Sequence, residues 1–346
     1  MSLLNKRERG IGFAKGDTWG TAVEPGTGHG IYLLRFSPPK GDRNLITDGD
    51  EFDHDLPTNV YPMDYPEQGG SMGGRFYWAG MERILASIFG IYTSSAPESG
   101  VVKHEFTFDP IIGSIFHSLA WDEGDEIKSV PSFKFKNLRI FYDDGFQWDT
   151  DIGGDRTVIA SWSDPLSLTY GSEGLGIWRL VNTTISINAQ GGADFAAGDA
   201  IHPSAIDINI DPKYTTLPVT AGYEGISEHE PGDDPPEFTV ALKFPKKDTT
   251  NNGFLTSFSA GTKYKMRIKC ESSAVISGKT SKYTFQLDLP GLYVVEAPEY
   301  AQESPVPVAV KFGIYRPSAA PTGMSAAVPY ASIINEVPAL TGYPAS

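Results

Sequence analysis

Alternation of apolar and polar residues with a period of two is the dominant pattern in this chain. It is clearest in NTTISINAQ, SAIDINID, EFTVALKF and SKYTFQLDL, at residues 182–190, 204–211, 237–244 and 281–289. Successive side chains of a β-strand point to opposite faces, so each segment is expected to place one face in a hydrophobic core. The pattern therefore predicts a mainly β protein with many short strands.

The same alternation predicts further strands at 30–36 and 103–109, and a last long strand at 305–315. Within residues 131–145 the apolar positions are odd-numbered up to Phe135 and even-numbered from Leu138. A shift of this kind inside a strand predicts a β-bulge, here near Asn137. In 103–109, the residues expected to share one face are His104, Phe106 and Phe108.

Helical patterns are few, and long polar segments separate some of the strands. Residues 79–90 (AGMERILASIFG) repeat apolar side chains at helical spacing and end in glycine, and residues 248–261 form a weaker pattern of similar length. The polar segments are 41–68 and 211–236, and connections this long are usually functional. Each half of the chain thus has the order strand, polar segment, strand, helix, strand. Although residue identity between the halves is negligible, this order predicts a structural duplication.

The charge of the chain limits its partners. It has 346 residues, with 28 Lys and Arg against 43 Asp and Glu, which gives a net charge of −15. A protein that holds duplex DNA in a basic groove is not expected to be so acidic. An acidic surface instead suits nucleic acid that must slide past without binding.

The single cysteine, Cys270, excludes an internal disulfide, and its inward position in a predicted strand indicates a buried, unreactive thiol. No run of about 20 apolar residues is present, and residues 1–16 lack the apolar stretch of a signal peptide. We therefore expect a soluble intracellular product with no membrane partner.

No catalytic or cofactor site is predicted. The acidic segment 51–56 (EFDHDL) is expected to be a solvated turn, with a divalent metal site as the alternative. The acidic segment 229–237 (HEPGDDPPE) lacks the ligand spacing of a calcium loop and is also expected to be solvated. The glycine-rich segments 69–74 and 171–176 lack the ending of a phosphate loop. The chain is therefore expected not to be an enzyme and to use no metal or cofactor.

A carbohydrate-binding or carbohydrate-cleaving β-protein is the alternative that the residues leave open. Carboxylate pairs occur at 121–126 and 142–145, although such sequences more often form turns. Tryptophans that would have to line a sugar groove are more often packed in a core or an interface. They are Trp19, Trp121, Trp148, Trp162 and Trp178.

Several short segments, taken in their order, resemble the tail tube proteins of long-tailed bacteriophages. This major tail protein family is related to the tubes of contractile injection systems. The segments are AKGDTWGTAV (14–23), ILASIFG (84–90), HEFTF (104–108), FKFKNLRIFYDDG (133–145) and the closing layout of 283–317. The likeness covers nearly the whole chain.

The resemblance implies a β-sandwich or half-barrel tube domain with a flanking α-helix, duplicated in the chain. The inner sheets of all subunits would merge into a ring-wide β-barrel. The expected domains are an N-terminal arm (1–29), a first tube-like β domain (30–195) and a second one (196–346). The alternative for the last is an immunoglobulin-like decoration domain. A duplicated chain would form a ring of three copies, and an unduplicated one a ring of six.

The implied function is structural: the rings would stack into the hollow tail tube that delivers DNA to the host. The expected partners are other copies of the chain, the tape measure protein and transiting DNA without specific binding, and the tail terminator and baseplate proteins. The expected location is the virion tail, after synthesis in the host cytoplasm. Another tail or baseplate component of the same lineage is a second alternative.

One strand carries the candidate assembly site. Residues 263–270 (KYKMRIKC) have apolar side chains on one face and cations on the other, namely Lys263, Lys265, Arg267 and Lys269. In so acidic a chain we expect this stripe to meet a carboxylate-rich face of an adjacent subunit or ring, with a solvated face as the alternative. The carboxylates expected there are Glu228, Glu230, Asp233 and Asp234, and further ring contacts are expected from Asp53, Asp55 and Trp19.

Overall fold

The computed structural model confirms a mainly β chain, with 53% of residues in strands and 8% in helices. It describes residues 10–40, 45–47, 60–62, 67–109, 115–123, 126–162, 168, 176–217, 226, 229–246, 249–296, 299–300 and 307–345.

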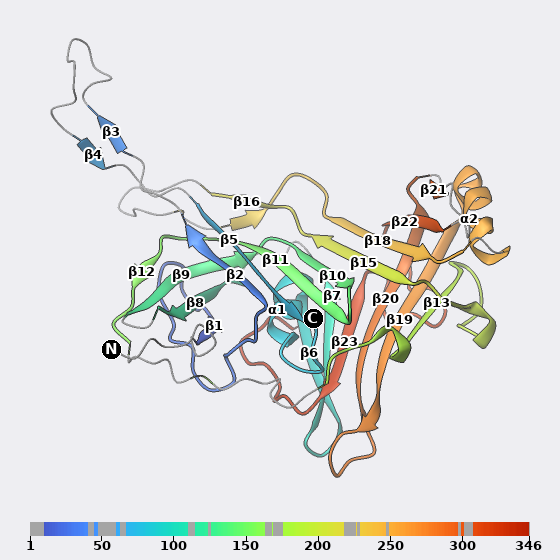
Figure 1. Ribbon diagram of the computed structural model, residues 1–346, viewed down its shortest axis with the longest axis horizontal. Coiled ribbons are helices and arrows are strands. Elements are labelled where there is room, and N and C mark those ends of the chain that lie inside the picture. Colours follow the sequence, from blue (N-terminus) through green and yellow to red (C-terminus); the bar gives the residue numbers. More distant parts are fainter. Residues whose placement is uncertain are drawn as a thin grey trace.

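The elements follow the chain in the order shown in Figure 1. Those of the first half are β1 (Ile11–Lys15), β2 (Arg35–Lys40), β3 (Leu45–Thr47), β4 (Val60–Pro62), β5 (Gln68–Arg75), α1 (Glu82–Phe89), β6 (Gly90–Glu98), β7 (Val101–Phe108), β8 (His117–Asp122), β9 (Ile127–Phe135), β10 (Leu138–Tyr142), β11 (Phe146–Gly154) and β12 (Val158–Ile159). Those of the second half are β13 (Thr183–Ala189), β14 (Ala200–Ile201), β15 (Ala205–Asp211), β16 (Tyr214–Thr216), β17 (His229–Pro231), β18 (Glu237–Phe244), α2 (Thr249–Ala260), β19 (Lys263–Val275), β20 (Lys282–Val294), β21 (Glu299–Tyr300), β22 (Val308–Ile314) and β23 (Tyr330–Asn335). Two short 3₁₀ turns occupy Leu180–Asn182 and Ala197–Asp199.

A single antiparallel network of hydrogen bonds joins 19 of these strands. It branches at β9, β11, β20 and β22, where two neighbours share one edge of the strand. One edge of β11 pairs with β5 while its other edge is shared by β10 and β9, and one edge of β20 pairs with β19 while its other edge is shared by β23 and β22. The run β10–β15–β18–β22 connects β11 with β20. Among the described residues, this network does not close into a barrel.

The same succession of elements and pairings occurs twice. In the first, β2 pairs with β5 across the intervening β3–β4 hairpin, and α1 leads into the β6–β7 hairpin. In the second, β15 pairs with β18 across the β16–β17 hairpin, and α2 leads into the β19–β20 hairpin. We call these two successions unit 1 and unit 2. The β3–β4 pair lies apart from the main body (Figure 1).

Unit 1 is built around helix α1, where the helical spacing of its apolar residues places Ile84, Leu85 and Ile88 in the core, each at most 1% exposed. The helix is shorter than the predicted 79–90 because it begins at Glu82, whose carboxylate accepts a hydrogen bond from the Gly80 N–H (2.9 Å). One large hydrophobic cluster contains side chains from both halves of the chain.

Three details of the predicted strands were wrong. The phase shift near Asn137 is a break between β9 and β10 rather than a bulge inside one strand. Asn137 stabilises the break, because its side chain accepts from the Asp151 N–H (2.8 Å) and donates to the Asp151 carboxylate (2.7 Å). The strand predicted at 305–315 is also not the last, since β23 follows it. The first predicted strand, 30–36, begins later, at Arg35.

Sheet pairing crosses the expected domain boundary at 195–196. β10 pairs with β15, β13 pairs with β19, and β7 pairs with β23. The expected arm also contributes to the body, since β1 pairs with β8 and Phe13 is only 2% exposed. In the described residues, neither helix is long and apolar enough to span a bilayer.

Candidate assembly interface

The cationic side chains of β19 divide into an enclosed pair and a partly exposed pair. Lys265 is fully buried, at 0% exposure, because the loops around residues 192 and 322 cover its ammonium group. Its ammonium group donates to three backbone carbonyls, of Gly192 (3.0 Å), Ala193 (2.7 Å) and Thr322 (2.7 Å). Burial lowers the pKa of Lys265, and the nearby carboxylates of Asp194 and Asp199 oppose that effect.

Arg267 is neutralised within the same chain. Its guanidinium group forms a bidentate pair with the buried carboxylate of Asp288 (2.7 and 2.8 Å) and donates to the carbonyl of Gly323 (2.6 Å). These hydrogen bonds raise the pKa of Arg267. Gln286 and Ser325 donate to the remaining lone pairs of Asp288 (both 3.1 Å), so the buried pair is well satisfied.

Lys263 and Lys269 remain available at the surface. Lys263 is exposed and lies over the ring of Tyr315, at 4.8 Å from its centroid. Lys269 is 43% exposed and pairs with Glu271 at 2.8 Å. Lys265 and Arg267 therefore anchor the loops around residues 192 and 322 to β19, and Lys263 and Lys269 are the more exposed cations of this strand.

The predicted acidic partners are only partly described. Glu230, Asp233 and Asp234 are exposed, and none of them forms an ion pair with another described residue. Glu228, Asp53 and Asp55 lie outside the described residues. No described contact within the chain joins these carboxylates to β19.

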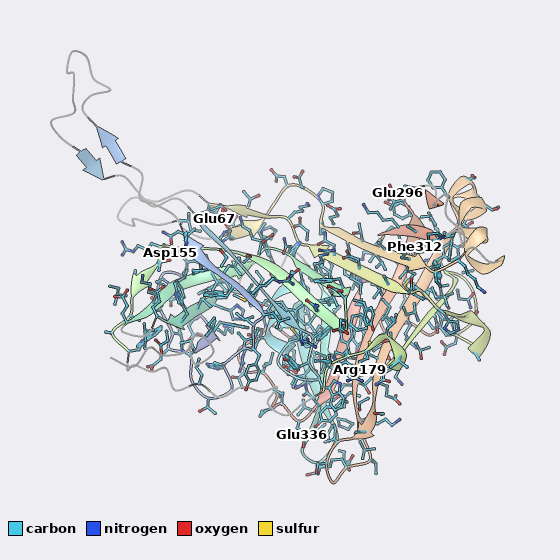
Figure 2. The ribbon with its side chains drawn as sticks, in the orientation of Figure 1. Glu67, Asp155, Arg179, Glu296, Phe312 and Glu336 are labelled. Atoms are coloured by element: carbon cyan, nitrogen blue, oxygen red, sulfur yellow. The ribbon has the colours of Figure 1, made fainter. Side chains whose placement is uncertain are left out.

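A second polar cluster, not predicted from the sequence, lies where the two long polar segments, 41–68 and 211–236, join the body of the protein. Glu67, just before β5, accepts hydrogen bonds from Thr216 (2.6 Å) in β16 and Lys136 (2.5 Å) after β9. His229 of β17 lies 2.9 Å from the same carboxylate and is fully buried. We call these four residues the loop-root cluster. Figure 2 labels Glu67 near the base of the segment that carries β3 and β4.

The loop-root cluster favours an ionised Glu67. Burial alone would raise the pKa of its carboxyl group, but the hydrogen bonds from His229, Lys136 and Thr216 lower it to about 2. The cluster also needs the glycine at position 153, since a Cβ there would collide with the Glu67 carboxylate and the Lys136 side chain.

Trp19 brings the N-terminal segment to the same place. Its indole N–H donates to the carbonyl of Ile226 (2.9 Å), and its ring packs edge-on against Phe116 and His229. Lys134 of β9 donates to the His229 carbonyl. The N-terminal segment at Trp19, the β8–β9 region and the segment that leads into β17 therefore contact one another here. Within the described part, Trp19 makes its contacts inside the chain.

Three features that the sequence raised as possible sites lie in the core or in a turn: Cys270, the 142–145 segment and three of the tryptophans. Burial raises the pKa of Cys270 to about 12, as expected of an inert thiol. The 142–145 segment is a turn, with Asp144 and Gly145 at positive φ. Among the described residues no group of three or more His, Cys, Asp or Glu side chains is placed to hold a metal ion. The tryptophans confirmed as core residues are Trp121, Trp148 and Trp178, at 5%, 1% and 1% exposure.

No protein-family model matches the chain, and no curated protein sequence matches it.

Proposed function

We propose that the chain is a structural subunit that self-assembles into stacked rings and forms the hollow tail tube of a long-tailed bacteriophage. The single observation that carries this proposal is the repetition of unit 1 and unit 2 with the same antiparallel pairings. Two tube-like units in one chain would form a pseudo-sixfold ring from three copies. The resemblance of the short sequence motifs points to the same architecture.

The edges of the sheet support assembly. The edge of β13 that does not face β19 is covered by β14 at only two positions, Ile185 and Ser186. Val181, in the 3₁₀ turn just before β13, is 85% exposed. Open edges and exposed apolar side chains favour pairing with another chain, and closure into a ring removes them. By contrast, the outer edge of β2 carries Pro38 and Pro39, which lack the N–H needed to extend a sheet.

The loop-root cluster supports a role for the long segments in contacts between rings. It holds the base of the first segment at Glu67 and of the second at Thr216 and His229, so both leave the body from one place. In this proposal, exposed carboxylates of the second segment, such as Asp233 and Asp234, meet Lys263 and Lys269 of a neighbouring copy. Such charge pairs set the register of stacking more than its strength.

Negative-stain electron microscopy of the purified protein tests the proposal. We expect hollow rings or tubes that form without any other protein. Dispersed monomers at high concentration would contradict it, and saturable binding of oligosaccharides by those monomers would favour the carbohydrate-binding alternative. Rings that do not stack would favour another tail or baseplate component.

A further inference from the structure

A cleft of about 800 Å³ lies between β1, α1 and the C-terminal segment 336–343. Its wall includes Lys15 at the end of β1, His29, and Arg83 in the first turn of α1. The C-terminal segment closes one side, where Leu340 donates its N–H to the Tyr92 hydroxyl group (2.9 Å) and Tyr343 lies 2.9 Å from His117. The cleft therefore belongs to the body and has a rigid wall.

The cleft lining contains two cations, Lys15 and Arg83, and two carboxylates, Asp17 and Glu336. Arg83 donates to the carbonyl of Gly28 and forms no ion pair with any described residue. Lys15 donates to the Gly16 carbonyl (3.2 Å) and makes a longer contact with Asp17 (3.8 Å), whose side chain is 90% exposed. Glu336 accepts a hydrogen bond from Tyr283 (2.8 Å). Among the described residues, Arg83 therefore lines the cleft without a carboxylate bonded to it.

His29 adds a neutral donor to these two cations. Its Nδ1 atom accepts from the Gly26 N–H (3.1 Å), which leaves the proton on Nε2. Burial and the charge of Arg83 lower the pKa of His29 to about 4, so the ring is neutral at pH 7. One guanidinium group, one ammonium group and one imidazole N–H line the same space. These are the donors that recognise oxygen anions in proteins.

We propose that this cleft binds an oxyanion, a carboxylate or phosphate group, through Arg83 and Lys15. A small phosphate from solution would supply one such group. An acidic side chain of a second copy of this chain would supply the other, and this source rests on the proposed function. The acidity of the chain favours the second source, because every neighbouring copy carries 43 Asp and Glu residues against 28 Lys and Arg residues.

Isothermal titration of the dispersed protein with inorganic phosphate, and separately with an N-acetylated glutamate peptide, tests the site. We expect saturable binding that both Arg83→Gln and Lys15→Gln weaken by about tenfold, the effect of losing one charged hydrogen-bond donor. Arg316→Gln is the matched control, since Arg316 is exposed and lies outside the cleft. Because Arg83 also holds Gly28, circular dichroism and a melting curve must first show that its variant is folded. If the Arg83→Gln variant is not folded, Lys15→Gln alone tests the site.

Each outcome has one meaning. No saturable binding of either ligand, or equal binding by the wild type and both cleft variants, overturns the proposal. If the cleft variants lose phosphate binding but still assemble, the ligand is a small anion from solution. If they lose both binding and assembly while Arg316→Gln keeps both, the ligand is a carboxylate of a second copy. Phosphate binding by a protein that never assembles would refute the proposed function and leave the oxyanion site standing.

Discussion

The two units follow the same order of elements but are stabilised differently. In unit 1, helix α1 is enclosed, with Ile84 at 0% and Leu85 at 1% exposure. In unit 2, helix α2 lies at the end of the body (Figure 1), where Phe254 is buried at 4% exposure but Phe258 is 39% exposed. Unit 2 shares the large hydrophobic cluster and adds the polar contacts of Lys265 and Arg267 on β19.

The difference lies in what covers the sheet, since an apolar helix does so in unit 1 and loops held by Lys265 and Arg267 do so in unit 2. An apolar helix packs against strands without needing polar partners, whereas a buried cation must find an acceptor for every donor. Lys265 meets this requirement with three carbonyls from two loops, which fixes those loops on the surface of unit 2. Variants that remove one contact at a time from each unit test this contrast.

Removal of a core side chain from α1 is expected to have the largest effect. Ile84→Ala should lower the free energy of unfolding by about 2–5 kcal/mol, because it leaves a cavity in the enclosed core. The matched change in α2, Phe258→Ala, should cost about 0.5 kcal/mol or less, since that ring is partly exposed. Urea unfolding of the two variants measures both values. Equal losses would contradict the contrast between the helices.

Loss of the buried cation of unit 2 is expected to have the next largest effect on stability. Lys265→Met keeps much of the side-chain volume but leaves three carbonyls without their donor, and should destabilise the protein by about 1–3 kcal/mol. Lys263→Met on the same strand should cost less than about 1 kcal/mol, because it removes only an exposed cation–π contact. Thermal melts at pH 7 compare the two. A larger loss in Lys263→Met would be inconsistent with the enclosed role of Lys265.

The loop-root cluster should give stability a dependence on acid pH. The pKa of Glu67 is lowered from 4.5 to about 2, so its contribution is present above pH 4.5 and is lost as the pH falls toward 2. Glu67→Gln should remove this part of the pH dependence and destabilise the protein at pH 7 by about 1–2 kcal/mol, through weaker hydrogen bonds to His229 and Lys136. Melts between pH 7 and pH 2.5 measure it. An unchanged pH profile would show that the cluster does not hold an ionised Glu67.

The smallest predicted effect concerns the contact between the two units at the hairpin turns. The Glu98 carboxylate, at the end of β6, accepts hydrogen bonds from the backbone N–H groups of Thr280 (3.1 Å) and Ser281 (3.2 Å) before β20. These bonds lower the pKa of Glu98. Glu98→Gln should leave the melting temperature nearly unchanged but speed amide hydrogen exchange at positions 280 and 281. Unaltered exchange there would mean that the turns are ordered independently of each other.

Local patterns in the sequence predicted much of the fold. Alternation located β13, β15, β18 and β20, because strands with one buried face must alternate. It missed β23 (YASIIN), where five of six side chains are buried and the period of two disappears.

The site was less predictable, because its partners are set by tertiary structure. Lys265 looked like part of an exposed stripe, but two loops that are distant in the sequence, around residues 192 and 322, cover it. The loop-root cluster joins Glu67 to His229 across 162 positions, and neither residue carries a local signal of that contact. The acidic residues of 229–237 were correctly expected to be exposed, since nothing apolar in the segment demands burial.

Cryo-electron microscopy of the purified protein, with two-dimensional averages of end-on views, measures how many copies form a ring. We expect hollow rings of three copies with pseudo-sixfold outlines, in which units 1 and 2 alternate around the lumen. True sixfold rings of six chains would contradict the duplication, and particles that never exceed the monomer would contradict assembly itself.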